Sequence, residues 1–461
     1  MKPIRRLFCR RIRRTKGAAF VTSMIFVLVF SALAVSMATM SGTNLQISEN
    51  QREADCARAC AESGLEIMRF WLSRCSATGD TDPALVFHTL ADSLQADLAA
   101  NDITNITTSH DSSTITIPSV ILDTENEKSF SAQITQLDPE TLRMDVTGVY
   151  KDTTKTIRTN YTFGVKQHTV FDYGVATKGP LSLSGNIELE GINVNVESDV
   201  YIVSENDLLA LSIIGNSSIA GDVHIWNPAG TVDLQGGKAS IGGVTAPEAY
   251  DHVITGADEV DFPVLNPEYF EHYVVEDLVY PTTNTTFENI RIPPNTNPSF
   301  EGGTTISGIV YIETPNVVTF TGNVTITGIV VGDGDITDDS GTNRIDFLGT
   351  VDSSSVTALP EEFGDLREET GTFLMAPGFS VSFGGTFETI NGAIAANGIT
   401  FYGNAGGIIE GSVVNYSDVP MTLSGNSDLY FNRSANTEIP AGFFPEIVLK
   451  YEPASYSEGP F

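Results

Sequence analysis

The chain begins with a long apolar pattern that predicts a helix. Residues from Gly17 to Ser48 carry no charge and are mostly apolar, and roughly 20 apolar residues are enough to cross the hydrocarbon core of a membrane as a helix. Good helix formers follow from Gln51 to Arg69, with Gly64 as the one weak position. We therefore expect one helix over residues 18–76, with its transmembrane half at residues 18–40.

The pattern changes between residues 77 and 170. A short helix is expected from Pro83 to Leu98. Beyond it, polar and apolar residues alternate with the period of two that is typical of half-buried strands. The alternating segments are Thr114–Ile117, Ser129–Ile134, Leu142–Val146 and Ile157–Phe163. Asp138-Pro139-Glu140 and Lys151-Asp152 are typical of hairpin turns. We predict a small antiparallel β meander whose apolar face is covered by the long helix, and assign residues 77–170 to this α+β head.

Two glycine-containing phrases recur beyond Gly174. The first places Gly and Asn after an apolar residue, at Leu183–Asn186, Ile214–Asn216, Phe320–Asn323, Tyr402–Asn404 and Leu423–Asn426. The second places Gly between two apolar residues, at Ile219–Val223, Ile306–Val310, Ile326–Val330, Ile390–Ile394 and Ile409–Val413. The interval from Gly308 to Gly328 is 20 residues, which is typical of solenoids. In such folds stacked coils share one core, and Gly and Asn turn the corners with φ > 0.

These repeats predict a β-helix over residues 171–440, which we expect to be right-handed. A β-sandwich is the alternative, because several coils are interrupted. Residues 245–297 are richer in Pro, aromatic and acidic residues, so we expect a long excursion there, and residues 359–368 a short helical insert that begins with Pro360. Residues 441–461 are assigned to a C-terminal tail. The predicted fold class is mainly β: a long N-terminal membrane-spanning α-helix, a small antiparallel β meander and a β-helix.

Charge is distributed unevenly along the chain. There are 58 acidic and 25 basic residues, a formal net charge of −33. Eight of the basic residues lie among the first sixteen, where there is no acid, so the rest of the chain carries a formal charge of −41. The basic leader, residues 1–17, would hold its end of the membrane helix in the cytoplasm, so that the body beyond the helix is exported. The acidity of the exported body argues against nucleic acid as a partner.

The first fifty residues fit three interpretations. A cleaved secretory signal peptide would use small residues such as Ala32-Leu33-Ala34. A plain signal anchor needs only the apolar span. The third interpretation rests on Lys16-Gly17 directly before the apolar segment and on the helical sequence that continues past the membrane. A signal peptide gives no reason for that continuation.

On these residues, and on Ala61–Glu66, the sequence resembles the type IV pilin-like proteins, and among them the PilX-type minor pilins. The resemblance implies cleavage by a prepilin peptidase between Gly17 and Ala18 and methylation of the new N-terminus. Major pilins have Glu at the fifth mature position, whereas this chain has Thr22. Thr22 avoids the cost of a carboxylate inside the bilayer, and this departure resembles PilX-type and tip pseudopilins more than shaft-forming subunits. The stretch from Gly371 to Asn432 also resembles the β-solenoid domain often fused to PilX-type N-termini.

Three cysteines fall in the exported part. Cys56 and Cys60 lie four residues apart on one helix face, with Cys75 near the helix end. A Cys60–Cys75 or a Cys56–Cys75 disulfide would attach the returning loop to the helix. Because the number of these cysteines is odd, at least one thiol would remain unpaired. The plainer interpretation is that they are small buried residues.

The sequence offers little catalytic chemistry. β-helices include polysaccharide lyases and hydrolases, but no cation recurs at coil spacing beside a carboxylate pair, so we expect no enzyme activity. Asp333, Asp335, Asp338 and Asp339 place oxygen atoms along a turning loop that is a weak candidate for Ca²⁺. A solvated acidic turn is the more ordinary interpretation, and no other cofactor is expected. Trp226 and Tyr311 could stack on sugars, although isolated aromatic residues usually pack in a core.

These observations together predict a non-catalytic minor pilin- or pseudopilin-like protein. It would sit in the bacterial inner membrane by a single span, with its N-terminus in the cytoplasm and its body periplasmic, surface-exposed or in a pilus. The expected partners are pilin or pseudopilin subunits, the pilus assembly machinery, prepilin peptidase and a surface glycan or protein ligand. The solenoid would serve pilus assembly or adhesion. The alternative is a β-helical polysaccharide lyase or hydrolase held by a membrane anchor.

Overall fold

The computed structural model describes residues 18–78, 85–101, 103–166, 168–433 and 439–459. The chain forms two compact units. The first, here called the head unit, comprises Met1–Ala77, Thr81–Gly164 and Val448–Phe461. The second, here called the solenoid unit, comprises Thr78–Asp80 and Val165–Ile447. In sequence, the solenoid unit is therefore inserted into the head unit.

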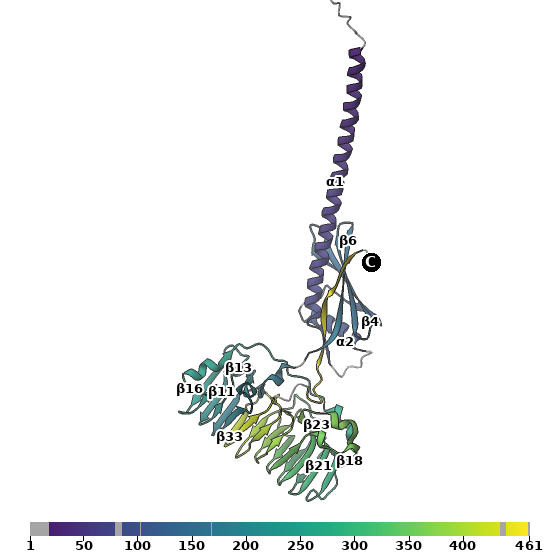
Figure 1. Cartoon of the computed structure of the whole chain (residues 1–461). Helices are drawn as coiled ribbons and strands as arrows, with labels where there is room; N and C mark the ends of the chain where they lie inside the picture. The colour runs from purple at the N-terminus through teal and green to yellow at the C-terminus, as the bar shows by residue number, and fades with distance from the viewer. Residues whose placement is uncertain (1–17, 79–84, 102, 167, 434–438, 460–461) are drawn as a thin grey trace, which may run out of the picture. The chain divides into compact units, whose positions relative to one another are not determined.

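Helix α1 (Ala18–Leu72) is 55 residues long and has two different surfaces along its length. Residues 19–50 are exposed all round, and this part is long and apolar enough to cross a membrane. From Ala57 onward one stripe is buried at intervals of three and four residues, through Ala61, Leu65 and Met68 to Leu72, as expected for a helix lying on a sheet. Figure 1 shows this lower part of α1 lying against the strands of the head.

The head sheet confirms the predicted antiparallel meander. Its central strands are β3 (Thr114–Asp123), β4 (Lys128–Asp138), β5 (Thr141–Tyr150) and β6 (Thr153–Lys166), paired in chain order. The tight connections at residues 139–140 and 151–152 coincide with the predicted turns. Helix α2 (Val86–Ala100) takes the place of the predicted short helix, and β1 (Ser76–Thr78) and β2 (Ser109–His110) lie at the two edges.

The predicted C-terminal tail was wrong. Residues 446–459 form strand β35 (Glu446–Gly459), which lies between β1 and β6 in the head sheet. Pro453 lies within this strand, and proline in a strand pattern argues against a central position. The segment becomes a strand of the sheet because it pairs with β1 and β6, which lie far from it in the sequence.

The solenoid unit is a β-helix of three parallel sheets, which confirms the predicted fold class. The largest sheet, here called sheet B, contains β7 (Val175–Thr177), β10 (Val200–Ile202), β13 (Val223–Ile225), β17 (Val253–Thr255), β18 (Glu276–Asp277), β19 (Thr286–Ile292), β21 (Thr304–Ile312), β23 (Val324–Gly332), β25 (Val351–Ser354), β26 (Thr372–Ala376), β29 (Ala393–Ala396) and β32 (Val413–Asn415). Sheet C contains β8 (Leu181–Gly185), β11 (Leu209–Gly215), β14 (Thr231–Gln235), β20 (Ser299–Phe300), β22 (Val317–Phe320), β24 (Arg344–Phe347), β27 (Ser380–Phe383), β30 (Ile399–Phe401) and β33 (Met421–Gly425). Sheet D contains β9 (Glu188–Gly191), β12 (Ser218–Ile219), β15 (Ser240–Ile241), β16 (Val244–Thr245), β28 (Thr389–Ile390), β31 (Gly407–Ile409) and β34 (Leu429–Phe431), with β16 antiparallel to β15.

The coils do not stack in the order of the chain. The first coil, β7 to β9, lies in the middle of the stack, with the coil of β10 to β12 on one side and the last coil, β32 to β34, on the other. After β17 the chain crosses to the opposite end, begins again at β18 and winds back until β32 meets β7. In Figure 1 the yellow strand β33 accordingly lies between the blue-green strands of the early coils and the green strands of the later ones.

The crossover corrects the predicted excursion. Strands β16, β17, β18 and β19 all belong to the solenoid sheets, so the longest stretch outside the strands runs from residue 256 to 275. It contains the short 3₁₀ helix η4 (Pro267–Tyr273). The predicted helical insert contains the 3₁₀ helix η6 (Glu361–Glu368), preceded by η5 (Val356–Ala358). Two further 3₁₀ turns, η1 (Thr169–Asp172) and η2 (Asn195–Ser198), flank the first coil, and η3 (Glu248–His252) precedes β17.

The interior of the solenoid contains a ladder of phenylalanine rings along sheet C. Phe300, Phe320, Phe347, Phe383 and Phe401 stack with centroid separations of 4.8–5.0 Å. The recurring Gly-Asn phrase turns the next corner of the coil. Gly185, Gly215, Gly403 and Gly425 have positive φ there. The neighbouring asparagines bond across the coils, Asn216 to Asn186, Asn186 to Asn426 and Asn426 to Asn404.

A second apolar layer covers the outer surface of sheet B. Strands β26 and β29 are buried at every residue, because side chains on both of their faces pack against other groups. The covering residues come from the crossover segment, the helical insert and the chain just before β35; they include Val260, Phe270, Leu359, Leu366 and Phe443. The interruptions of the repeat are therefore packed elements of the fold.

Candidate functional site

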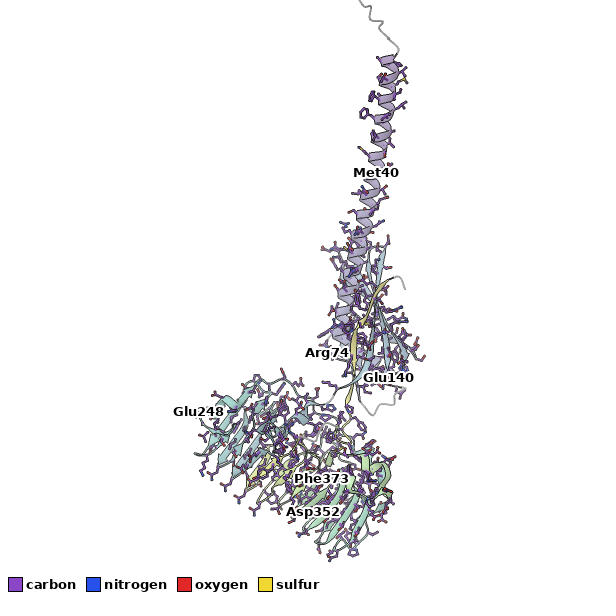
Figure 2. All side chains as sticks on the ribbon, in the orientation of Figure 1. Met40, Arg74, Glu140, Glu248, Asp352 and Phe373 are labelled. Atoms are coloured by element: carbon purple, nitrogen blue, oxygen red, sulfur yellow. The ribbon has the colours of Figure 1, made fainter. Side chains whose placement is uncertain are left out.

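The exposed part of α1 is the first candidate, as an assembly and membrane surface. Phe20, Met24, Leu28 and Leu33 are between 47 and 67% exposed, and Figure 2 shows Met40 projecting from this part of the helix. Three of its hydroxyl groups, those of Ser23, Thr39 and Thr43, donate to carbonyl oxygens of the helix itself; Thr39 Oγ1, for example, donates to the Val35 oxygen at 2.9 Å. Such back-bonding lets a polar side chain lie in lipid without an unpaired donor.

The predicted processing site falls partly outside the described residues. Gly17 is not described, and α1 begins at Ala18. Thr22, at the fifth position from Ala18, lies in the first turns of α1, within the exposed part. No acidic residue occurs from Ala18 to Ser48, so this length of helix offers no carboxylate to a neighbouring subunit.

The lower part of α1 meets the head sheet through two glycines. A Cβ atom at Gly64 would lie 2.5 Å from Cγ of Phe130 on β4, and one at Gly148 on β5 would lie 2.2 Å from the Ala57 carbonyl oxygen on α1. These approaches explain the Ala61–Glu66 motif. Ala61 and Leu65 are buried, Gly64 makes room for the ring of Phe130, and Glu62 points outward, where it pairs with Arg58 at 3.0 Å.

Cys56, Cys60 and Cys75 are free thiols in the structure, so it carries neither of the disulfides considered from the sequence. Cys60 and Cys75 are buried in the head unit and Cys56 is partly exposed. Burial raises the pKa of Cys75 to about 12, and burial also raises the pKa of Cys60. Both thiols are protonated at neutral pH and act as small apolar residues.

The acidic loop does not gather its carboxylates. Asp335 accepts hydrogen bonds from Thr337 N at 2.8 Å, and Asp338 accepts one from Ser340 N at 2.9 Å, as in ordinary Asx turns. Asp333 accepts from Thr314 N at 2.7 Å, and Asp339 accepts from Asn397 at 3.1 Å. Across the described parts of the chain, no three His, Cys, Asp or Glu side chains are placed to hold a metal ion together.

The solenoid surface contains a cleft of about 980 Å³ between the crossover segment and the outer face of sheet B. All of its lining residues belong to the solenoid unit. One wall is formed by Tyr201, Val203 and Trp226 from the early coils, and the other by residues 259–266 of the crossover segment. Phe444 and His168 also line the cleft, with His168 Nε2 2.8 Å from the Phe444 carbonyl oxygen.

Two tyrosine hydroxyls fix the crossover wall. Tyr201 Oη accepts from Val260 N and donates to the Asp258 carbonyl oxygen, both at 3.1 Å. Tyr416 Oη donates to the Pro263 carbonyl oxygen at 2.8 Å. Burial raises the pKa of Tyr201 to about 12 and raises the pKa of Tyr416 well above its usual value. Both hydroxyls therefore remain protonated donors, and the wall is held in one position.

Lys178 is the basic residue of the cleft lining that has no counter-charge. Its Nζ lies 5.5 Å from the ring centroid of Phe262 and 5.4 Å from that of Tyr416. Among the described residues it has no ion-pair or hydrogen-bond partner for its ammonium group. The cleft lining also contains the carboxylates of Glu205, Glu259, Asp261, Glu268 and Asp418, of which Asp261 is paired with Lys166. The cleft thus presents one donor cation, several acceptor anions and aromatic walls.

Sequence reasoning missed this cleft. Trp226 was considered without neighbouring residues, and residues 245–297 were expected to form a long excursion outside the coils. The enrichment of Pro, aromatic and acidic residues at 245–297 was the available signal. It did not indicate which strands the segment would cover, because that depends on the order of the coils. Tyr311, the other aromatic residue considered, is buried in the layer over sheet B.

Comparison with known proteins bears on the N-terminal region. Residues 16–66 match the model of the PilX N-terminal family. No curated protein sequence matches the chain. One similar solved structure is the competence-associated pilin ComZ from Thermus thermophilus, 12% identical, covering 88% of this chain and 97% of that one with a TM-score of 0.25. Another is an ice-binding protein with antifreeze activity (LeIBP) from an Arctic yeast, 12% identical, covering 60% of this chain and 97% of that one with a TM-score of 0.20.

The N-terminal region is type IV pilin-like. The match at residues 16–66 spans the Lys16-Gly17 junction, the apolar half of α1 and the Ala61–Glu66 motif. These are the parts of the chain on which the resemblance was drawn from the sequence. The two structural similarities are too weak to add to this conclusion.

Proposed function

We propose that the protein is a non-catalytic minor pilin- or pseudopilin-like protein that displays a β-helical domain outside the inner membrane. The proposal rests on the difference between the two parts of α1. Its first part is exposed and apolar over residues 19–48, and its second part packs on the head sheet through Gly64 and Gly148. A helix of this kind has one half free for lipid or for neighbouring helices and one half that anchors its own head.

Processing involves the same region. The basic leader would stay in the cytoplasm, and prepilin peptidase would cut between Gly17 and Ala18 and expose a methylated amine. With Thr22 in place of a carboxylate, the subunit lacks the charge that would attract a neighbour's amine. We therefore propose a position at a filament tip or in the assembly complex, with pilin or pseudopilin subunits as partners.

The N-terminus of the mature protein tests the proposal. Mass spectrometry of the full chain purified from membranes should show a protein that begins at methylated Ala18. A Gly17→Leu variant should keep its leader, whereas Lys16→Arg, which preserves the charge, should be processed normally. An intact leader in the unaltered protein, or a cut after Ala34, would refute the pilin-like role.

Location in the cell is tested separately. Deletion of the gene should reduce the number of pili or adhesion of the cells, and the protein should appear in sheared filaments or remain with the inner membrane. Absence of any change in piliation, secretion and adhesion would contradict a role in such a system. The membrane-anchored lyase or hydrolase is the competing function, and the carboxylates and Lys178 of the cleft are the observation in its favour.

A further inference from the structure

The cleft on the solenoid unit has the size of a binding site for an extended small molecule. Its volume of about 980 Å³ is near the upper end of the roughly 300–1,000 Å³ that is typical of ligand sites. Its walls are supported by the buried hydroxyl contacts of Tyr201 and Tyr416. Because the walls are already fixed, a ligand would not have to supply the free energy of ordering them.

The aromatic side chains supply flat apolar surfaces within this cleft. Trp226, Phe262 and Phe444 are each partly exposed and each contribute to its lining. The face of an aromatic ring carries partial negative charge, so it attracts groups whose hydrogens carry partial positive charge. The C–H face of a pyranose ring is such a group, and it is also flat.

The polar groups of the lining are mostly acceptors. Glu205, Glu259, Glu268 and Asp418 are exposed at the cleft, and an ionised carboxylate only accepts hydrogen bonds. Lys178 supplies the complementary donor. Its Nζ lies beside the contacting rings of Phe262 and Tyr416, without an acceptor of its own among the described residues. A ligand that fills this site must therefore both donate and accept, and sugar hydroxyl groups do both.

Charge narrows the ligand further. The carboxylates repel an anionic ligand such as a uronate chain. They attract a cationic ligand such as a basic peptide, but Lys178 repels a cationic group at the place where the aromatic rings lie. An uncharged ligand meets neither penalty. Its binding should also depend little on salt, because screening acts on interactions between charges.

From this geometry we propose that the cleft binds an uncharged oligosaccharide, with Trp226 and Phe262 as stacking surfaces, Lys178 as donor, and Glu205 and Glu268 as acceptors. This inference deepens the proposed function, since it gives the displayed solenoid a ligand. Binding itself does not require that the helix enters a filament.

The test uses the full chain, purified in a detergent without a sugar head group so that the detergent cannot compete. Isothermal titration measures binding of neutral gluco-, manno-, xylo- and N-acetylchito-oligosaccharides, with chitosan oligomers, oligogalacturonates and a polylysine peptide as charged probes. We expect at least one neutral oligosaccharide to bind, with a Kd that changes little between low and high salt. Binding of the charged probes alone, or of none of the panel, would overturn the assignment.

Variants locate the site. Glu205→Gln, Glu268→Gln and Lys178→Gln should each raise the Kd about tenfold, because each replaces a hydrogen bond to a charged group with a weaker neutral one. Trp226→Ala should weaken binding further. Glu388→Gln and Tyr402→Ala change an exposed carboxylate and a partly exposed ring elsewhere on the solenoid and should leave the Kd unchanged. Unchanged binding in all three polar cleft variants would place the ligand elsewhere and refute the proposal, even if Trp226→Ala fails to fold.

The same samples separate this inference from the proposed function. New reducing ends or unsaturated products on incubation, lost in Glu205→Gln, would keep the cleft as a carbohydrate site and refute the non-catalytic role. A mature N-terminus other than Ala18, with neutral oligosaccharide binding intact, would refute the pilin-like role alone.

Discussion

At the scale of single residues, Glu197 and Arg433 join the first and last coils of the solenoid. Glu197 is 4% exposed and accepts hydrogen bonds from Asn193 N at 2.8 Å and Arg433 N at 3.1 Å. The Arg433 guanidinium donates to the carbonyl oxygens of Phe171, Val196 and Glu197. More than 230 residues separate the two partners in sequence, so this contact exists only because the last coil returns to the first.

Because of these hydrogen bonds, the contribution of the Glu197 carboxylate to the stability of the fold depends on pH. Burial by itself raises the pKa of Glu197, but the hydrogen bonds from Asn193 and Arg433 outweigh it, so the pKa lies below its usual 4.5. A carboxyl whose pKa is lower in the folded state stabilises the fold above its unfolded pKa. It loses that contribution as the pH falls through the folded pKa.

Glu197→Gln should therefore lower the free energy of unfolding by about 2 kcal/mol at neutral pH, the contribution typical of hydrogen bonds to a charged group. The difference from the unaltered protein should shrink as the pH falls below 4.5. Urea unfolding at a series of pH values measures it, with the exposed Glu190→Gln as a control that should show no such difference. A difference that stays constant down to the lowest pH would contradict this account.

At the scale of elements, the packing of α1 on the head sheet depends on the absence of a side chain at Gly64. Alanine is favoured over glycine in a helix by about 1 kcal/mol. A methyl group at Gly64, however, would lie 2.5 Å from Cγ of the fully buried Phe130 ring. Gly42 lies on the same helix and has nothing within 4 Å of the corresponding position. Alanine substitutions at these two positions therefore distinguish the effect of helix propensity from the effect of packing against Phe130.

Gly64→Ala should destabilise the head by about 1–3 kcal/mol, as overpacking does, whereas Gly42→Ala should be neutral or slightly stabilising. Thermal unfolding of the full chain in detergent measures both. Adding Phe130→Leu should recover part of the loss at Gly64, because residues in contact are coupled. Equal effects of the two alanine substitutions would show that Phe130 does not limit this position.

The elements themselves were largely predictable, because their signals are local. The apolar stretch and the run of helix-forming residues after it predicted α1, and alternation predicted the strands of the meander. The Gly-Asn phrase predicted the solenoid corners, since Gly185, Gly215, Gly403 and Gly425 all adopt the positive φ that favours glycine. Gly322, in the remaining copy of the phrase, is not among the glycines with positive φ, so the phrase does not dictate that conformation by itself.

At the scale of the whole molecule, the order of the coils is the main structural finding. In sheet C, β8 pairs with β33 although they lie at opposite ends of the solenoid sequence, whereas β14 and β20, which are consecutive along the chain in that sheet, lie at its two edges. Ser182 is directly opposite Thr422 in this pairing. Neighbouring strands are about 4.8 Å apart, within the reach of a disulfide.

Cysteine pairs test this order. In a background with the native cysteines replaced by alanine, Ser182→Cys with Thr422→Cys should form a disulfide under mild oxidation, detectable by mass spectrometry of peptides. Asp233→Cys with Ser299→Cys, on the two edge strands, should remain reduced. A disulfide in the second pair and none in the first would mean that the coils stack in chain order.

The sequence by itself determined the pilin-like N-terminus, the head strands and the solenoid class, because each is specified by residues close together in the chain. Only the tertiary structure decided that β35 completes the head sheet, that the first coil lies beside the last, and that the crossover segment forms a cleft with Trp226 and Lys178. The physical reason is that stacked coils join through backbone hydrogen bonds and similar apolar rows. Many pairs of coils satisfy those contacts equally well, and the choice among them rests on long-range contacts such as Arg433 with Glu197.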